Sequence, residues 1–362
     1  MLVPVEATAA ALLPALAAAL DGGDAVLPVG ADRDRVLTAL RPDEPLEHQD
    51  TAVVVPTSGS TGEPKGALLS AAALRASAAA TATRLGGPGQ WLLAIPPTHI
   101  GGLQVLVRSL LAGTNPAVLA GPFTPEAFAA VRLTGERRYV SLVPTQLRRL
   151  VDAGTDLSAY DAILLGAAAA PADLLRRAAE AGGRVVTTYG MSETAGGCVY
   201  DGVPLAGVTA SVADGLVRLA GPVLASGYRL RPDLTTRAFG PEGFTTSDLG
   251  RIDGGRLTVL GRADDVIVTG GEKVAPLAVE AALQQHPAVV DAGVVGLPDE
   301  QWGAQVVAAV VLRASLSLAA ARDHVGATLP RVWAPRRLVE VTEIPLLPTG
   351  KIDRARLRST LR

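Results

Sequence analysis

Short apolar runs alternate with longer alanine-rich or amphipathic segments from Thr8 to about Asp264. Runs of about four to eight apolar residues, bounded by glycine, proline and polar residues, are typical of strands buried on both faces. We therefore expect strands at residues 25–29, 52–55, 91–95, 117–120, 139–143, 162–165 and 185–188.

Helix start and stop signals mark the segments between these runs. Ser70 precedes a segment that reaches Leu85, and a glycine pair follows it. Thr124 stands before a proline, an order that favours the N-terminus of a helix. Residues 9–20 and 172–181 also end close to glycine pairs, so helices are expected in all four places.

The alternation of strands and helices predicts an α/β fold, with a large layered N-terminal domain built on a mainly parallel sheet. Ligands of such sheets gather at the carboxyl ends of the strands. Residues 203–262 break the pattern, because they carry short strands and turns such as Asp253-Gly254-Gly255 without helical periodicity. They predict a β-rich subdomain that follows the layered part.

The composition excludes several classes of protein. A length of 362 residues suggests two or three domains, and a net charge of −2 without a basic run argues against a nucleic-acid partner. The single cysteine, Cys198, excludes an intramolecular disulfide and a multi-cysteine metal site, which favours a cytoplasmic location. Because the chain has only four histidines, zinc chemistry is not expected.

The apolar residues 9–20 do not predict a signal peptide. Glu6 precedes them, Pro14 interrupts them, and no basic segment stands before them. No run reaches the roughly 20 apolar residues that cross a bilayer. A soluble protein without a membrane span is therefore expected.

Residues 57–66 read Thr-Ser-Gly-Ser-Thr-Gly-Glu-Pro-Lys-Gly and follow an apolar run. The three glycines let backbone N–H groups approach a polyanion, while the four hydroxyls and Lys65 add donors and a positive charge. The alternative is a mobile surface loop rich in glycine and serine. A Walker loop is excluded, because its Gly-Lys-Ser/Thr ending is absent.

Lysine is rare in this chain. Among 33 basic residues only Lys65, Lys273 and Lys351 are lysines, and each lies in a segment that contains glycine. Arginine carries a broad planar fork, whereas lysine carries a point charge on a flexible stem. Since the chain uses arginine almost everywhere, we interpret the three lysines as positions that need an ammonium group. The alternative is three solvated surface residues.

All ten positions of residues 57–66 match the signature of the adenylate-forming enzymes, the acyl-CoA synthetase superfamily. Residues 189–194, 246–250 and 348–354 resemble further motifs of this family. The resemblance implies a large domain over residues 1–262 and a small, mobile α+β lid over residues 263–362, with Asp264 as the hinge. The phosphate loop usually lies much later in the family, so the first subdomain is expected to be shortened.

The resemblance also implies how ATP binds. Tyr189 would stack on adenine, and Asp248 would accept hydrogen bonds from both ribose hydroxyls. Alanines replace most glycines of the turn beside adenine, so its φ angles are expected to be restricted. The implied ATP contacts are Thr57, Ser58, Gly59, Ser60, Thr61, Gly62 and Lys65 in the phosphate loop, Gly166, Ala167 and Ala168 in the adenine turn, and Tyr189, Gly190, Met191, Ser192, Asp248 and Arg262.

The resemblance assigns catalysis to a few side chains. Lys351 would neutralise charge during adenylation, and Thr194 would contact the α-phosphate. Glu193, together with Thr61, would hold the magnesium ion that neutralises the triphosphate. His99 would serve at the carboxylic-acid substrate.

Residues 96–103 resemble the family segment that lines the acid pocket, where His99 lies and Gly101 and Gly102 would leave space for a ring. Residues 91–113 and 139–147 look most like the o-succinylbenzoate-CoA ligases of menaquinone biosynthesis. That acid has a second carboxylate, for which the candidate partners are Arg108, Ser141 and Thr145. In the lid, Gly270 and Gly271 would line the tunnel for coenzyme A, close to Lys273.

The implied reaction has two steps. A carboxylic acid and ATP give an acyl adenylate and pyrophosphate, and the thiol of CoA then displaces AMP after the lid has rotated. The implied partners are a small carboxylic acid, ATP and CoA, and a homodimer is common among enzymes of this size. The alternatives are a ligase for another aryl or acyl acid, an enzyme that loads a carrier protein, a non-catalytic nucleotide-binding protein and a helical interaction protein.

Overall fold

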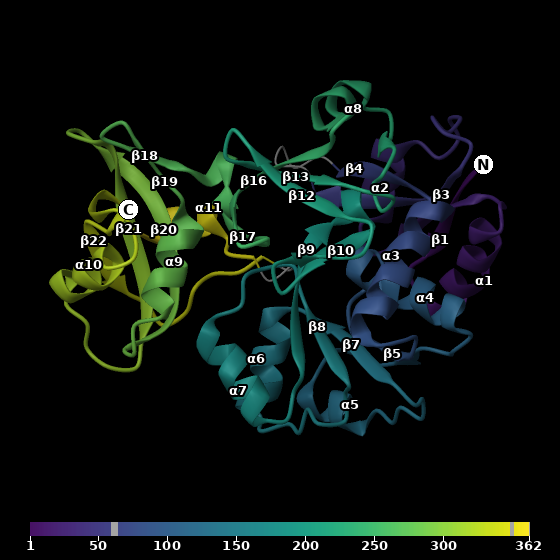
Figure 1. Cartoon of the computed structure of the whole chain (residues 1–362), viewed down its shortest axis with the longest axis horizontal. Helices are drawn as coiled ribbons and strands as arrows, with labels where there is room; N and C mark the ends of the chain where they lie inside the picture. The colour runs from purple at the N-terminus through teal and green to yellow at the C-terminus, as the bar shows by residue number, and fades with distance from the viewer. Residues whose placement is uncertain (59–63, 348–350, 362) are drawn as a thin grey trace.

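The structure, a computed structural model, describes residues 1–58, 64–347 and 351–361. A large N-terminal domain and the smaller lid stand next to each other (Figure 1). The large domain contains two main sheets instead of the single central sheet that the alternating pattern suggested. A layer of helices separates these sheets, so both faces of most strands are buried.

The first sheet has the order β1-β2-β3-β4-β14. Its first three strands run parallel, whereas β4 returns beside β3 and β14 pairs with β4 from a distant part of the sequence. The strands are β1 (Leu2–Glu6), β2 (Ala25–Val29), β3 (Thr51–Ser58), β4 (Pro64–Ser70) and β14 (Gly227–Tyr228).

The second sheet has the order β11-β10-β9-β8-β7-β5-β6. The five strands from β9 to β6 are parallel, and β10 and β11 are added antiparallel at one edge. The strands are β5 (Gln90–Leu93), β6 (Ala117–Val118), β7 (Arg138–Leu142), β8 (Ala162–Leu165), β9 (Val185–Met191), β10 (Gly196–Tyr200) and β11 (Val203–Pro204).

Helices fill three layers around these sheets. The middle layer consists of α1 (Ala9–Leu20), α3 (Ala71–Leu85) and α4 (Ile100–Ala112), which share one core with both sheets. The outer face of the first sheet is covered by α2 (Arg33–Leu40). The far face of the second sheet is covered by α5 (Pro125–Ala130), α6 (Pro144–Asp152) and α7 (Ala172–Glu180).

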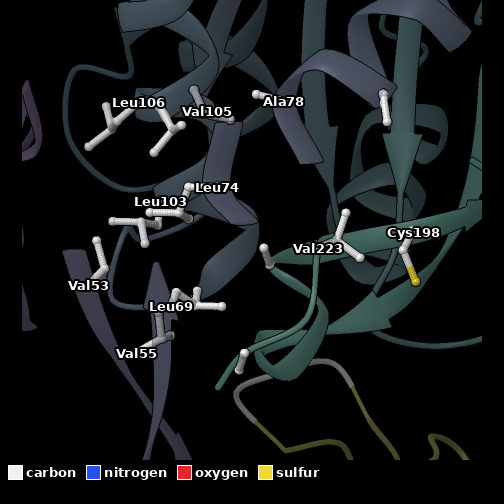
Figure 2. Close-up of a cluster of buried hydrophobic side chains, with 14 of the residues drawn as sticks. Val53, Val55, Leu69, Leu74, Ala78, Leu103, Val105, Leu106, Cys198 and Val223 are labelled. Carbon is white, nitrogen blue, oxygen red and sulfur yellow. The ribbon is translucent and has the colours of Figure 1, made fainter. Parts of the chain in front are cut away.

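Successive residues of β3 serve different cores. Val53 and Val55 pack into the middle layer, while Val54 faces the core under α2. Figure 2 shows Val53, Val55 and Leu69 from the first sheet close to Leu74 and Leu103 from the helices. Because a strand points alternate side chains to opposite faces, a strand buried on both faces reads as a continuous apolar run.

The predicted helix ends are found at α3. The side chain of Ser70 accepts a hydrogen bond from the backbone N–H of Ala73 at 3.1 Å, which satisfies a donor of the first turn. Gly86 follows the last turn with a φ of 87°, a left-handed conformation that glycine adopts without steric cost. Serine and glycine therefore define this helix as the sequence indicated.

A third sheet completes the large domain. It has the order β12-β13-β16-β15, with β17 also paired to β16, and it forms the expected β-rich subdomain. The sequence did not predict the short helix within it. The elements are β12 (Thr209–Ala213), β13 (Leu216–Ala220), α8 (Pro232–Ala238), β15 (Phe239–Gly240), β16 (Gly243–Asp253) and β17 (Arg256–Arg262).

The lid is a small α+β unit. A hairpin of β18 and β19 precedes a sheet of the order β20-β21-β22, and helices pack on both faces of that sheet. Its elements are β18 (Ile267–Thr269), β19 (Glu272–Val274), α9 (Pro276–Gln284), β20 (Val289–Asp299), β21 (Gly303–Leu312), α10 (Leu318–Gly326), β22 (Arg337–Glu340) and α11 (Arg354–Leu361). In the described part of the chain, each helix is too short or too polar to cross a bilayer.

Candidate active site

The phosphate-loop candidate joins two antiparallel strands, β3 and β4. Thr57 lies opposite Lys65 in this hairpin, and its hydroxyl donates to the Lys65 carbonyl at 3.2 Å. Gly66 leaves no room for a side chain, because a Cβ would lie 2.6 Å from Val54. The predicted loop residues Gly59, Ser60, Thr61 and Gly62 and the side chain of Ser58 lie outside the described residues.

Lys65 meets two groups from distant segments. Its ammonium lies 3.5 Å from the carboxylate of Glu193 and 3.2 Å from the hydroxyl of Tyr228. Tyr228 donates a hydrogen bond of 2.6 Å to the same carboxylate oxygen, Oε1 of Glu193. Burial and the neighbouring carboxylate raise the pKa of Tyr228, so the phenol remains protonated. The predicted phosphate-binding lysine and the predicted metal ligand are therefore adjacent.

Glu193 lies in a short 3-10 turn, η1 (Ser192–Thr194), between β9 and β10. The Thr194 hydroxyl is fully buried, donates to the Gly196 carbonyl and accepts from the Met191 N–H. Gly190 is required by the close approach of β10, since a Cβ there would lie 2.2 Å from the Gly196 carbonyl oxygen. In this conformation Thr194 orders the turn that presents Glu193, and its phosphate contact stays a prediction.

Tyr189 and Asp248 are also in contact. The Tyr189 hydroxyl donates to Asp248 Oδ2 at 2.7 Å, and burial together with this carboxylate raises the pKa of the phenol. Arg262 approaches the other carboxylate oxygen at 4.0 Å and binds Asp264 with two hydrogen bonds of 2.9 and 2.8 Å. The three predicted nucleoside contacts thus form one network that reaches the predicted hinge.

Lys351 lies close to this network. Its positive charge is one of the causes that lower the pKa of Asp264, after the hydrogen bond and the charge of Arg262. Asp264 lies in the short turn η2 (Ala263–Asp265), directly after β17. An isolated bridge joins Leu346 and Ile352, on either side of Lys351 in the sequence. In this conformation the charge of Lys351 therefore acts on the predicted hinge residue.

The predicted adenine turn, residues 166–168, follows β8. Ala167 has a φ of 71°, so it adopts the left-handed conformation that favours glycine. Gly166 cannot be enlarged freely, because a Cβ would lie 2.7 Å from the Thr188 hydroxyl. The turn thus keeps the backbone shape of a glycine-rich turn although alanine occupies position 167, and Ala168 is partly buried beside it.

Substitutions in this turn should have opposite signs of effect. Ala167→Gly relieves a backbone cost of about 1–2 kcal/mol, while the added entropy of the unfolded chain costs about 0.4–1 kcal/mol, so the variant should be more stable by up to about 1.6 kcal/mol. Gly166→Ala should destabilise the protein by about 1–3 kcal/mol through its contact with Thr188. Thermal unfolding of both variants measures this difference, and a strongly destabilised Ala167→Gly protein would contradict it.

The candidate acid-pocket residues lie after β5 and β7, two parallel neighbours of the second sheet. His99 is the N-cap residue of α4, and its side chain is exposed. Enough protein still surrounds the imidazole that desolvation lowers its pKa, while Asp32 acts in the opposite direction. A neutral imidazole is therefore favoured near neutral pH.

The glycine pair after His99 has two different roles. A Cβ on Gly101 would only touch Ile95, at 3.4 Å. A Cβ on Gly102 would lie 2.3 Å from the Ile95 carbonyl oxygen, so the space beside Gly102 is filled by backbone. The expectation that both glycines leave space for a ring is therefore wrong for Gly102, which instead allows α4 to pack against residues 95–96.

The three candidates for a second carboxylate lie on three different elements, α4, β7 and α6. Ser141 is buried on β7, and Thr145 is partly buried in the first turn of α6. Arg108 is buried on α4, where it donates to the Thr81 hydroxyl and lies over the Trp91 ring. Burial lowers the pKa of Arg108. Its Nε has no hydrogen-bond partner among the residues that the structure describes.

The candidate CoA residues lie apart from this site. Gly270 and Gly271 form the turn of the β18–β19 hairpin with φ angles of 56° and 85°, and Lys273 is exposed on β19. Two positive φ angles are typical of a type I′ hairpin turn, which explains the glycine pair. The hairpin is held within the lid, because the Gly270 N–H donates to the Trp302 carbonyl at 2.9 Å. The CoA contact of these residues stays a prediction.

Sequence reasoning missed Tyr228. The chain has only five tyrosines, and this one follows a glycine in an otherwise irregular segment. The scarcity of aromatic residues is the one signal in the sequence that could have drawn attention to it. Its place between Lys65 and Glu193 depends on the pairing of β14 with β4, which spacing along the chain does not reveal.

Two protein-family models match this chain. The family model described as AMP-binding enzyme matches residues 6–228, and that of the AMP-binding enzyme C-terminal domain matches residues 278–351. The chain belongs to the AMP-binding enzyme family. Among family members, a Mycobacterium tuberculosis protein named "Probable 2-succinylbenzoate--CoA ligase" is 50% identical, over 98% of this chain and 96% of its own length. The 2-succinylbenzoate--CoA ligase of Geobacillus kaustophilus is 34% identical over 95% of this chain and 76% of its own.

Solved structures of the family have the same fold. The o-succinylbenzoate CoA synthetase of Bacillus subtilis, in complex with the acyl-adenylate intermediate OSB-AMP, is 27% identical with a TM-score of 0.72, over 96% of this chain and 80% of its own. The amide bond synthetase McbA of Marinactinospora thermotolerans is 28% identical with a TM-score of 0.77, over 94% of this chain and 76% of its own. Both likenesses include a large N-terminal domain and a small C-terminal one.

Proposed function

We propose that this protein is an ATP-dependent acid–thiol ligase that converts 2-succinylbenzoate to its CoA thioester through an acyl adenylate, releasing AMP and pyrophosphate. The observation that carries this proposal is the 50% identity to the mycobacterial relative over nearly the whole of both chains. The contacts among Lys65, Glu193, Tyr189 and Asp248 support it, because they join residues that the family resemblance assigns to ATP.

In the first step the substrate carboxylate attacks the α-phosphorus of ATP. Two anions must meet, so the protein has to neutralise charge and hold the reactants in line. Lys65 on β4 and Lys351 in the C-terminal lid supply ammonium groups from the two domains. Tyr189 and Asp248 bind the nucleoside, and the turn at residues 166–168 forms the wall beside adenine.

Magnesium fits the donor set at Glu193. Mg²⁺ in nucleotide sites usually takes one or two protein carboxylates and completes its shell with phosphate oxygens and water. The described residues contain no group of three or more His, Cys, Asp or Glu side chains that could hold a metal without substrate. Glu193, with Thr61, would hold the ion against the triphosphate, where it supplies charge neutralisation.

In the second step the thiol of CoA attacks the acyl carbon and AMP leaves. In the conformation described here the charge of Lys351 acts on Asp264. For the second step the lid would turn and bring Gly270 and Gly271 to the large domain. Asp264 is the proposed pivot, and its two hydrogen bonds with Arg262 would change when the lid turns. Lys273 would move with the hairpin towards CoA.

The acid site is proposed at the carboxyl ends of β5 and β7, between His99 and Thr145. This is the edge at which parallel sheets bind their ligands. Arg108 is the proposed charge for the second carboxylate, because a buried guanidinium without an acidic partner among the described residues is costly on its own. A cytoplasmic location and a homodimer complete the proposal.

The test is acid-dependent release of pyrophosphate from ATP and magnesium. The acids are 2-succinylbenzoate, benzoate, a coumarate-like acid and a medium-chain fatty acid, each with and without CoA. Turnover with 2-succinylbenzoate should exceed that with benzoate by about tenfold or more, the value of one charged hydrogen bond. A thioester should appear only when CoA is added. Faster turnover with another acid would retain the mechanism and reject the substrate.

A further inference from the structure

Tyr228 lies between two charged side chains, those of Lys65 and Glu193. The Lys65 ammonium is 3.2 Å from the phenol oxygen and 4.2 Å from the ring centroid, so it contacts both the hydroxyl and the aromatic face. The same hydroxyl donates to Glu193 at 2.6 Å. A single side chain thus touches the proposed phosphate-binding cation and the proposed metal ligand.

The ring of Tyr228 is held from several sides. The residue is 4% exposed, and Phe239 packs against it edge to face with 5.6 Å between centroids. Its backbone N–H donates to the Thr235 hydroxyl, and β14 pairs with β4. The turn that carries Glu193 is held to the segment just before β14, since the Ala225 N–H donates to the Glu193 carbonyl at 2.8 Å. The phenol therefore has little freedom to move relative to the carboxylate.

The two oxygens of Glu193 are not equivalent. Oε1 accepts the phenol hydrogen bond and is the oxygen nearest to Lys65. Oε2 has no hydrogen bond to any residue within the described ranges 1–58, 64–347 and 351–361. A donor fixed on one oxygen orients the plane of the carboxylate and leaves the second oxygen for another ligand.

We propose that Tyr228 is a positioning residue that orients Glu193 for magnesium-bound ATP and keeps this orientation when Lys65 leaves the carboxylate for a phosphate. The inference rests on the proposed function, since it requires ATP and magnesium as ligands. Without the nucleotide, Lys65 and Glu193 compensate each other's charge at 3.5 Å. When the nucleotide binds, Lys65 turns to a phosphate and Glu193 to magnesium, so their ion pair is lost. The hydrogen bond from the neutral Tyr228 phenol to Glu193 is kept.

The test measures binding instead of turnover. Isothermal titration calorimetry gives the Kd of ATP with excess Mg²⁺ and with EDTA, for the wild type, Tyr228→Phe and Tyr160→Phe. Tyr160 is a matched control, because it is another buried tyrosine of the large domain and belongs to the core under α5 and α6. Tyr228→Phe should weaken binding of Mg·ATP by about tenfold and that of metal-free ATP by less than about twofold, whereas Tyr160→Phe should change neither.

A double-mutant comparison separates positioning from folding. If Tyr228 acts through Glu193, Tyr228→Phe should have almost no further effect on Mg·ATP binding in a Glu193→Gln background. Additive losses, or equal losses with Mg²⁺ and with EDTA, would overturn the inference and make Tyr228 a general support of the pocket. A wild type that binds no Mg·ATP would overturn the proposed function as well, so the two failures are distinguishable.

Discussion

Replacement of Lys351 by alanine is expected to slow formation of the acyl adenylate by about 10²-fold or more, which is about 3 kcal/mol of lost transition-state stabilisation. The reaction of preformed acyl adenylate with CoA should stay close to the wild-type rate. The reason is that the charge of Lys351 acts on Asp264 in this conformation, whereas the glycine turn proposed for the second step lies on the β18–β19 hairpin. In the proposed mechanism, each half-reaction uses a different face of the lid.

The two half-reactions can be followed separately. Pyrophosphate release reports adenylation, and thioester formation from synthetic acyl adenylate reports the second step. Arg356→Ala is the matched control, because Arg356 is an exposed cation on α11, shortly after Lys351. It should leave both rates unchanged. Equal losses of both half-reactions in Lys351→Ala would contradict the division of labour between the two faces.

The buried strands of the large domain were predicted well because burial of both faces requires a continuous run of apolar residues. The central part of β3, residues 52–55, is buried on both faces, so each of these four residues is apolar and the run stands out. Burial on both faces also conceals the number of sheets, because the sequence does not distinguish a valine that packs against α2 from one that packs against α3. The split into two sheets depends on packing between elements, and that information is distributed over the whole chain.

Other elements were missed for local reasons. β4 begins with Pro64, Lys65 and Gly66, residues of low strand propensity. Gly66 is needed there because a side chain would collide with Val54. α4 begins at Ile100 and contains Gly101 and Gly102, residues that argue against a helix when read alone. In both cases a requirement of close backbone approach overrides local propensity.

The candidate site shows the same limit. Its motif residues Lys65 and Glu193 were predicted from the family resemblance, and the structure brings them to 3.5 Å. Tyr228 lies 163 positions from Lys65 in the sequence, and β14, on which it stands, has only two residues. No periodicity extends over so short a strand, so the contact is visible only after the sheet has formed.

A second large effect is expected in the lid, where Arg354 binds two carboxylates. Its guanidinium forms hydrogen bonds of 2.5 and 3.2 Å to Glu280, one of 3.2 Å to Asp265 and one of 2.8 Å to the Val294 carbonyl. The Glu280 side chain is only 2% exposed. Arg354→Met leaves this carboxylate buried without its cation, which should destabilise the lid by about 3–5 kcal/mol.

The loss should depend on pH. Burial raises the pKa of Glu280 even beside Arg354, and removal of the guanidinium should raise it further. A carboxyl whose pKa is higher in the folded than in the unfolded state contributes stability at low pH that is lost as the pH rises through the folded pKa. The difference between the variant and the wild type should therefore be larger near about pH 8 than near about pH 5, as urea unfolding of the full chain would measure.

A double variant identifies the unpaired charge as the cause. Glu280→Gln added to Arg354→Met removes the buried charge, and its amide oxygen can still accept the Val294 N–H hydrogen bond that Glu280 accepts at 2.8 Å. It should restore about 1–4 kcal/mol and abolish the added pH dependence, whereas the exposed control Arg356→Met should change stability by no more than about 0.5 kcal/mol. If the second substitution deepens the loss instead, the cost lies in packing around the arginine stem. Because Arg354 follows Lys351 by three positions and contacts Asp265 beside the proposed hinge, its removal should also slow adenylation.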